Sequence, residues 1–350
     1  MIIDSFDNIS EPIITPQSFF GEKKNICDIA IGTFSREIYP AVLAKYPHEE
    51  IGELRAANKI KKIHLLNVGG MQVVFYLSEI GATLAGTDII ELNWLTGADK
   101  FILFGSAGSL NKEITTGKYV IPTEAYRDEG MSYHYAEADD YISIKNADRL
   151  ADIFTKNELP FVKGKVWTTD ALYRETRDAV RQRKEEGCIA VEMELAGVQA
   201  VCDYHGFELY DFLVTGDVVD QPDYSPDGLT EANHSLDKFD VALAIARSIK
   251  NAPYVPADPG VRPHNTDVLQ KFHRNRFIMH ILLAISVVLS ISGIAVMFKR
   301  PIILCTGILV LLVSLFFGAF TGAMCCPYCG HPIGRNSFGP RCTNCGRRIL

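Results

Sequence analysis

The sequence predicts an α/β domain whose mixed, largely parallel central sheet is flanked by helices. Three observations support this fold class. Short apolar runs of strand length recur, several of them end at glycine, and segments with helical periodicity separate them. Alternation of apolar strands with helices is typical of parallel sheets, whose ligand sites lie at the carboxyl ends of the strands. An active site is therefore expected at that edge.

Length and charge divide the chain into an acidic part and a basic part. At 350 residues the chain has room for about two domains. Nine of its 35 Lys and Arg residues, and none of its 42 Asp and Glu residues, lie from Lys271 onward. The first 270 residues thus contain 26 basic and 42 acidic side chains, a net charge of −16. This balance is not that of a nucleic-acid-binding domain.

The N-terminus lacks the basic start and apolar core of a secretory signal peptide. We therefore expect the main domain to be cytosolic. The thiols of Cys27, Cys188 and Cys202 are then expected to be reduced and buried in its core.

Four apolar runs have the composition of buried strands: residues 26–31, 62–68, 100–104 and 210–215. A longer segment, residues 73–95, has a helix-like pattern interrupted by glycines. Gly32 follows the first run and precedes a helical pattern, so free backbone N–H groups and Arg36 could bind an anion there. A simple tight connection is the alternative.

Residues 187–198 form an apolar run that we expect to turn into a helix with two glutamates. At 100° per residue, Glu194 falls within an apolar stripe that includes Val191 and Leu195, whereas Glu192 points away from it. A partly buried carboxylate needs a partner. A hydroxyl-rich ligand and a salt bridge to Arg or Lys are the two alternatives.

Polar residues follow two of the expected strands. Ser106 lies in a segment of small residues, and Asp217 follows Gly216. In a parallel sheet these residues share one edge with Gly32, and Glu194 can join them. Such a set suits cleavage of a glycosidic bond, in which an acid protonates the leaving group and a carboxylate holds sugar hydroxyls. Capping of a helix is the alternative role for Asp217.

Three motifs in order along the chain resemble those of the nucleoside phosphorylase superfamily, which includes purine nucleoside and uridine phosphorylases and methylthioadenosine/S-adenosylhomocysteine nucleosidases. They are residues 105–108 (GSAG), 190–194 (AVEME) and 216–221 (GDVVDQ). Residues 168–173 (TTDALY) are similar to the family's base-pocket segment. The resemblance covers residues 26–250 and implies the family's fold and a homo-oligomer, since members often share sites across subunits.

The resemblance implies a role for each matching residue. Glu194 would hold the ribose 2′- and 3′-hydroxyls, and Asp217 would protonate a purine at N7. Thr176 and Asp178 stand where uridine enzymes have Gln and Arg, which favours a purine. The other implied contacts are Met193 under the sugar, Leu172 and Tyr173 at the base, His134 near the pocket, and Gly32, Arg36 and Ser106 facing the attacking phosphate or water.

Departures from the family bear on whether phosphate or water attacks the sugar. Leu103 replaces the second phosphate arginine of phosphorylases, and a lost charge-assisted contact costs about 1.5–3 kcal/mol of phosphate binding. Glu37 is placed to activate water, as a glutamate does in nucleosidases. Arg36 matches a phosphorylase arginine, however, and Leu213 replaces one that nucleosidases often have. Hydrolysis is slightly favoured. Phosphorolysis is the close alternative, and a nucleoside sensor or scaffold without turnover is another.

Two apolar segments follow a proline-rich linker. Residues 277–298 and 301–324 contain no Asp, Glu, Lys or Arg. At about 1.5 Å per residue each extends roughly 33–36 Å, enough to cross a bilayer. Only Lys299 and Arg300 separate them, which predicts a helical hairpin, with a buried soluble hairpin as the alternative. Basic residues before the first span and after the second favour two cytoplasmic ends.

The C-terminal residues contain two Cys-x-x-Cys-Gly motifs. Their spacing is typical of a zinc ribbon, in which four thiolates hold a structural Zn²⁺ in a closed site. The expected ligands are Cys326, Cys329, Cys342 and Cys345. A pair of disulfides is the alternative.

The sequence thus predicts a membrane protein with two spans, whose nucleoside-cleaving domain and zinc ribbon face the cytoplasm. The expected segments are an N-terminal extension (1–25), the catalytic domain (26–250), a linker (251–276), two transmembrane helices (277–298 and 301–324) and the ribbon (325–350). The expected partners are a small-molecule nucleoside, the lipid bilayer, further copies of the chain and an unknown partner of the ribbon. Phosphate is a candidate co-substrate, and no organic cofactor is expected.

Overall fold

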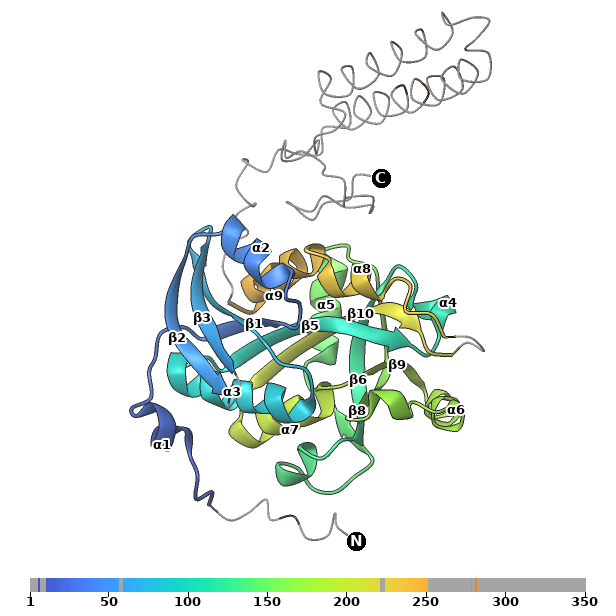
Figure 1. The fold of residues 1–350 in the computed structure, drawn as a ribbon, viewed down its shortest axis with the longest axis horizontal. Helices are drawn as coiled ribbons and strands as arrows, with labels where there is room; N and C mark the ends of the chain where they lie inside the picture. Colours follow the sequence, from blue (N-terminus) through green and yellow to red (C-terminus); the bar gives the residue numbers. More distant parts are fainter. Residues whose placement is uncertain are drawn as a thin grey trace, which may run out of the picture. The chain divides into compact units, whose positions relative to one another are not determined.

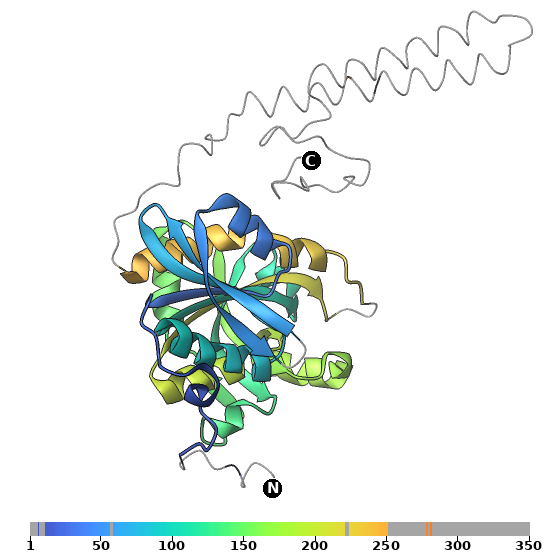
Figure 2. The same ribbon diagram turned by 60° about the vertical axis from the view of Figure 1, so that its left-hand side comes forward.

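The computed structural model describes residues 11–56, 59–220 and 224–250, together with Phe6 and two helical isoleucines at positions 278 and 281. The chain divides into two compact units, Met1–Pro256 and Ala257–Leu350. Figures 1 and 2 show the fold of the first unit. The expected linker, membrane spans and zinc ribbon otherwise lie outside the described residues. Among the described residues, no helix has both the length and the apolar character needed to span a bilayer.

Within the described ranges, ten strands form one sheet. They are β1 (Ile29–Thr33), β2 (His48–Ala56), β3 (Lys59–Val68), β4 (Met71–Leu77), β5 (Lys100–Ser109), β6 (Tyr119–Asp128), β7 (Tyr141–Ser143), β8 (Phe161–Thr169), β9 (Cys188–Glu192) and β10 (Glu208–Val218). The strand order is β10-β6-β8-β9-β5-β1-β4-β3-β2, and β7 pairs with β6. Because β10 also pairs with β5, the first five strands close into a ring, from which β1, β4, β3 and β2 extend.

The sheet is mixed, as expected, but it is not largely parallel. Five pairings are parallel, namely β1 with β4, β1 with β5, β10 with β5, β6 with β8 and β8 with β9. The other five described pairings are antiparallel. Short connections explain part of this difference. Gly69 and Gly70, both with positive φ, turn β3 directly into β4, and so tight a turn requires antiparallel strands.

Helices cover both faces of the sheet. They are α1 (Pro16–Phe20), α2 (Ile38–Lys45), α3 (Ala82–Thr96), α4 (Lys112–Thr115), α5 (Ala147–Lys156), α6 (Arg177–Glu185), α7 (Leu195–His205), α8 (Leu229–His234) and α9 (Asp237–Lys250), with short 3₁₀ turns η2 (Ser132–His134) and η3 (Leu172–Arg174). Figure 1 shows α2, α8 and α9 on one side of β5, and α3 and α7 on the other. On the first side, the ring of Phe239 in α9 lies 5.0 Å from that of Phe75 in β4.

The expectation of a helix across residues 73–95 is wrong in its first part. Met71–Leu77 is strand β4, which lies between β1 and β3. Its residues from Val73 to Tyr76 are fully buried. A strand covered on both faces has a continuous apolar run, which in sequence cannot be told from a buried helix. The helical pattern is right from Ala82, where α3 begins.

The other expected strands are present with different bounds. The run at 26–31 becomes β1, which begins at Ile29 and includes Gly32. The small residues 105–109 continue β5, and Asp217 lies inside β10. These residues therefore belong to strands and not to the turns in which we expected them.

Part of the expected N-terminal extension packs on α3. The indole Nε1 of Trp94 donates a 2.9 Å hydrogen bond to the carbonyl of Gly21, and the backbone N of Lys24 donates one of 2.9 Å to the carbonyl of Trp94. The segment that includes α1 is thus fixed to the main domain by hydrogen bonds to the side chain and the backbone of Trp94.

Candidate active site

Adjacent parallel strands bring three of the expected site residues to one edge of the sheet. Strand β5 lies between β1 and β10, and Val214 of β10 is level with Ser106. Asp217 is level with Gly108, close to the end of β5. Gly32 lies one residue before the end of β1. The carboxyl ends of the three strands therefore form the edge at which the sequence places the site.

Glu192 and Glu194 lie between a strand and a helix, and not on one helix as expected. Glu192 ends β9, and α7 begins at Leu195. The buried Glu192 carboxylate accepts 2.7 Å hydrogen bonds from the backbone N of Glu194 and of Leu195, and a further bond from the Thr168 hydroxyl. The expectation that Glu192 points away is wrong, because its carboxylate satisfies free N–H groups at the start of α7.

The Glu194 side chain is partly buried, as expected. Its Oε1 accepts a 2.7 Å hydrogen bond from the backbone N of Gly81, just before α3. Burial, and then the charge of Glu192, raises the pKa of Glu194 from 4.5 to about 8. The ionised carboxylate is therefore incompletely compensated, and hydroxyl donors of a sugar are a group that could stabilise it.

Further buried carboxyl groups lie near Glu194. Burial is the main cause that raises the pKa of Glu192 to about 7. Burial, together with the charges of Glu192 and Glu194, raises the pKa of Asp211 in β10 well above its usual range. Oδ2 of Asp211 and Oε1 of Glu129 have no hydrogen-bond partner among the described residues. This side of the site is acidic and incompletely hydrogen-bonded.

Strand registers limit the separation of Glu194 from Asp217. Asp217 is level with Gly108, and Gly108 is level with Val191 of β9. Two strand spacings separate Asp217 from Val191, on the order of 10 Å. A Cβ at Gly108 would lie 2.9 Å from Val191 Cγ1 and 3.7 Å from Asp217 Oδ1, so both side chains lie on the same face. Glu194 follows Val191 by three residues, so the backbones of Glu194 and Asp217 lie within about 20 Å of each other.

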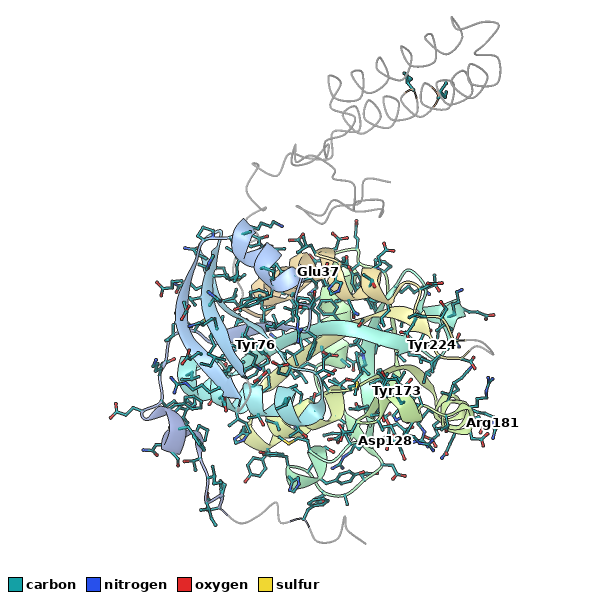
Figure 3. All side chains as sticks on the ribbon, in the orientation of Figure 1. Glu37, Tyr76, Asp128, Tyr173, Arg181 and Tyr224 are labelled. Atoms are coloured by element: carbon teal, nitrogen blue, oxygen red, sulfur yellow. The ribbon has the colours of Figure 1, made fainter. Side chains whose placement is uncertain are left out.

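Asp217 has polar neighbours that the sequence did not indicate. It is 8% exposed, lies in a strand and caps no helix. Its Oδ2 accepts a 2.9 Å hydrogen bond from Tyr224 Oη. Burial and the charge of Asp217 raise the pKa of Glu175 to about 7, and the pKa of Tyr224 rises to about 12 through burial and its bond to Asp217. The charge of Tyr173 also contributes to the raised pKa of Tyr224. Figure 3 shows the two tyrosines on the same side of the unit.

The expected nucleophile side of the site involves α2, β5 and α8. Arg36 and Glu37 are exposed just before α2. Oε1 of Glu37 lies 3.8 Å from Nε2 of His234, the last residue of α8. The hydroxyl of Ser106 in β5 donates to Oδ1 of Asn233. Helix α8 therefore connects Glu37 with Ser106.

Protein side chains lie close to two glycines of the strand ends, the expected ligand-binding residue Gly32 and its neighbour in the next strand, Gly105. A Cβ at Gly32 would lie 2.6 Å from Cδ2 of Leu103 and 2.6 Å from the ring of Tyr76. A Cβ at Gly105 would lie 3.3 Å from the ring of Phe34. These glycines permit close packing of the sheet, because a larger side chain at either position would meet its neighbours.

The expected base-pocket residues lie in exposed turns. Leu172 is 51% and Tyr173 is 96% exposed in η3. Met193 is partly buried between β9 and α7. His134 is exposed at the end of η2, and its ring lies 4.4 Å from that of Phe6. No contact among the described residues connects His134 to the two carboxyl groups.

Sequence reasoning missed several residues of this edge. Thr168 lies within the recognised base-pocket segment, so its position was indicated but its bond to Glu192 was not. Glu175, Tyr224, Asn233 and His234 have no distinctive spacing, and only the fold brings them to the strand ends.

Metal ligands are not grouped in the described part of the chain. No cluster of three or more His, Cys, Asp or Glu suited to a metal ion occurs there. Cys27, Cys188 and Cys202 are free and buried, as expected. The four cysteines proposed for zinc lie outside the described residues.

Comparison with known proteins identifies a family. The model described as "Phosphorylase superfamily" matches residues 28–250, which is more than half of the chain. An uncharacterized protein of Acanthamoeba polyphaga mimivirus is 26% identical over 212 residues, which cover 59% of this chain and 83% of that protein.

Two relatives with named activities match shorter segments. A guanosine phosphorylase of Halorubrum lacusprofundi is 28% identical over 157 residues, 44% of this chain and 64% of the relative. A DeoD-type purine nucleoside phosphorylase of Bacillus cereus is 28% identical over 130 residues, 36% of this chain and 55% of the relative. The chain thus spans less than two thirds of either relative.

Two solved structures are similar to this fold. A mutant of futalosine hydrolase from Helicobacter pylori has a TM-score of 0.51 at 17% identity, covering 65% of this chain and 100% of the other. The 5′-methylthioadenosine/S-adenosyl homocysteine nucleosidase of Campylobacter jejuni has a TM-score of 0.52 at 17% identity, covering 64% and 99%. At this identity the similarity establishes the fold.

Proposed function

Because the chain belongs to the phosphorylase superfamily, we propose that it cleaves the N-glycosidic bond of a purine nucleoside, and that water is the attacking group. One observation supports this proposal above the others. Glu194, whose carboxylate is partly buried and has spare acceptor capacity, follows β9, and the buried acid Asp217 lies in β10, on the other side of β5. One carboxyl group suits sugar hydroxyls, and the other suits a leaving base.

In the proposed reaction Glu194 accepts hydrogen bonds from the ribose 2′- and 3′-hydroxyls, with Met193 beneath the sugar. Asp217 donates its proton to N7 of the purine as the bond between N9 and C1′ breaks, so the base leaves as a neutral molecule. Water attacks C1′, and Glu37 takes the proton that the water loses. The products are ribose, or a ribose derivative, and the free base.

Charge near the nucleophile supports water over phosphate. Leu103, where phosphorylases that the chain resembles have an arginine, is 1% exposed and provides no charge. The exposed carboxyl group of Glu37 lies just after the end of β1, beside His234. Because like charges repel, a carboxylate at this place disfavours a phosphate dianion more than a neutral water molecule.

Phosphorolysis is the second candidate. Arg36 is exposed beside Glu37 and could bind phosphate as a co-substrate. The named activities of the relatives, a guanosine phosphorylase and a purine nucleoside phosphorylase, also favour it.

The deciding experiment follows base release from purine nucleosides by the full-length protein. The substrates are inosine, guanosine, adenosine and 5′-methylthioadenosine, each assayed with and without inorganic phosphate. Base release without phosphate supports hydrolysis, and release only with phosphate supports phosphorolysis. Tight nucleoside binding without release instead supports a sensor or scaffold.

Two variants connect this assay with the site. Asp217→Asn keeps the size of the side chain but cannot donate the acid proton, so base release is expected to fall at least about 100-fold. Asp152→Asn changes an exposed aspartate of α5 and is the matched control. Equal losses in the two variants would contradict the role of Asp217.

The C-terminal part suggests how this domain is tethered. We propose that residues 277–298 and 301–324 cross a membrane as a hairpin, with the catalytic domain and the ribbon on the cytoplasmic side. We also propose that Cys326, Cys329, Cys342 and Cys345 bind one structural Zn²⁺, that the ribbon contacts a further partner, and that the protein is a homo-oligomer. Membrane fractionation, protease protection, zinc analysis and light scattering of the detergent-solubilised protein test, in turn, the membrane crossing, the cytoplasmic side, the zinc site and the oligomeric state.

A further inference from the structure

Helix α8 packs directly on the strand that contains the proposed acid. A Cβ at Gly216, the residue before Asp217, would lie 2.7 Å from Ala232 Cβ and 2.9 Å from Leu229 Cα. The buried ammonium of Lys238 fixes the other end of the helix, since it donates to the carbonyl of Ala232 and, at 3.3 Å, to that of Asn233. Helix α8 is thus packed on β10 and hydrogen-bonded to α9.

The last two residues of α8 contact two different segments of the site. Asn233 Oδ1 accepts a hydrogen bond from the hydroxyl of Ser106. His234 Nδ1 lies 2.7 Å from Ser35 Oγ, and His234 Nε2 lies 3.8 Å from Glu37 Oε1. These contacts connect α8 with β5 on one side and with the loop before α2 on the other.

The hydrogen bonds of Ser35 determine which ring nitrogen of His234 carries the proton. The Ser35 hydroxyl oxygen accepts from the backbone N of Glu37 at 3.2 Å and of Ile38 at 3.1 Å. These bonds use both acceptor positions of the hydroxyl, so its hydrogen points to Nδ1 of His234. Because Nδ1 then accepts, the ring proton of His234 is on Nε2, which faces the carboxylate of Glu37.

We propose that His234 and Asn233 are positioning residues for the attacking nucleophile. Nε2 of His234, 3.8 Å from Oε1 of Glu37 and so beyond direct hydrogen-bond distance, restrains the exposed Glu37 carboxylate electrostatically, and Asn233 holds the hydroxyl of Ser106, so that water is bound between the two groups. Glu37 needs such a partner because its side chain is 71% exposed and otherwise free to take other rotamers. This inference rests on the proposed hydrolytic function.

The test uses kinetics of the full-length protein with the purine nucleoside that it cleaves fastest without phosphate. His234→Phe keeps a ring but removes both nitrogens, and it is expected to lower kcat about 10- to 100-fold while KM changes less than about twofold. His234→Gln, whose amide can accept from Ser35 and donate to Glu37, is expected to recover part of that loss. Thr230→Ala, an exposed position of the same helix, is the control.

A double-mutant comparison distinguishes positioning from a general structural role. If His234 acts through Glu37, the variant Glu37→Gln/His234→Phe is expected to be no slower than Glu37→Gln alone. The inference would be overturned if the double variant were slower than Glu37→Gln by the same factor by which His234→Phe is slower than the wild type. Asn233→Leu is likewise expected to lower kcat, with the midpoint of thermal unfolding unchanged.

Other results have equally definite meanings. Wild-type kcat in His234→Phe, in a protein that does cleave nucleosides, overturns this inference and leaves the proposed function standing. No base release by the wild-type protein overturns both. If His234→Phe does not fold, His234→Asn replaces it, because its shorter amide cannot reach Ser35 and Glu37 together.

Discussion

Replacement of Glu194 by glutamine is expected to change how stability depends on pH. The pKa of Glu194 rises from 4.5 to about 8 in the folded chain. The folded state therefore binds more protons than the unfolded state between these values, and stability falls as pH rises through that range. Each unit of pKa difference corresponds to about 1.4 kcal/mol, so Glu194 removes about 2 kcal/mol of stability between pH 5 and pH 7.

The measurement is urea denaturation of the full-length protein at half-unit steps from pH 5 to pH 7. The measurement stops at pH 7 because of Lys238. Burial lowers the pKa of this lysine from 10.5 to about 7, so above pH 7 its deprotonation makes the free energy of unfolding rise with pH. Glu194→Gln removes one titrating group, so the fall in the free energy of unfolding between pH 5 and pH 7 should be smaller by about 2 kcal/mol. Glu113→Gln, an exposed position, should leave the fall unchanged. Equal slopes for the wild type and Glu194→Gln would refute the reasoning.

Three further substitutions test other contacts. Tyr224→Phe removes the hydrogen bond to Asp217 and should lower kcat/KM for base release about 3- to 10-fold. The effect is modest because Tyr224 is exposed, and water can replace part of the bond. Wild-type kinetics in this variant would count against the contact. Lys61→Met leaves the carboxylate of Asp88 buried and unpaired, and urea denaturation should show a loss of about 3–5 kcal/mol, whereas a loss below about 1 kcal/mol would mean that the pair is dispensable. Gly32→Ala places a methyl group 2.6 Å from its neighbours and should cost about 1–3 kcal/mol, and a thermal midpoint equal to that of the wild type would contradict the packing.

The alternation of apolar runs and helices was enough to predict an α/β domain with a mixed sheet flanked by helices. It was not enough to predict strand direction. The β3–β4 turn and the pairing of β9 with β5 introduce antiparallel pairs that depend on connection geometry and not on composition. Likewise Met71–Leu77, buried on both faces, has no period that separates a strand from a helix.

The motif around Glu194 illustrates the limit at the level of one residue. A helical wheel drawn through Val191 and Leu195 predicted the partial burial of Glu194, which is correct, but gave the wrong reason. The chain is a strand up to Glu192, and the glutamates lie at a strand-to-helix junction. The buried role of Glu192 follows from free N–H groups that exist only once α7 is in place.

Contacts between distant segments could not be predicted from local patterns. The bond of His234 to Ser35 joins residues 199 positions apart, and that of Asn233 to Ser106 joins residues 127 apart. Single polar residues in a short helix show no periodicity that marks them as partners. Their role follows from the packing of α8 against β10, which the fold alone reveals.

The central claim is that one nucleoside contacts both Glu194 and Asp217, and a crystal structure of the protein with a bound purine nucleoside tests it most directly. The account predicts that the ribose 2′- and 3′-hydroxyls lie about 2.6–3.0 Å from the Glu194 carboxylate, with Asp217 at hydrogen-bond distance from N7. A nucleoside bound elsewhere, or bound with its sugar away from Glu194, would contradict it.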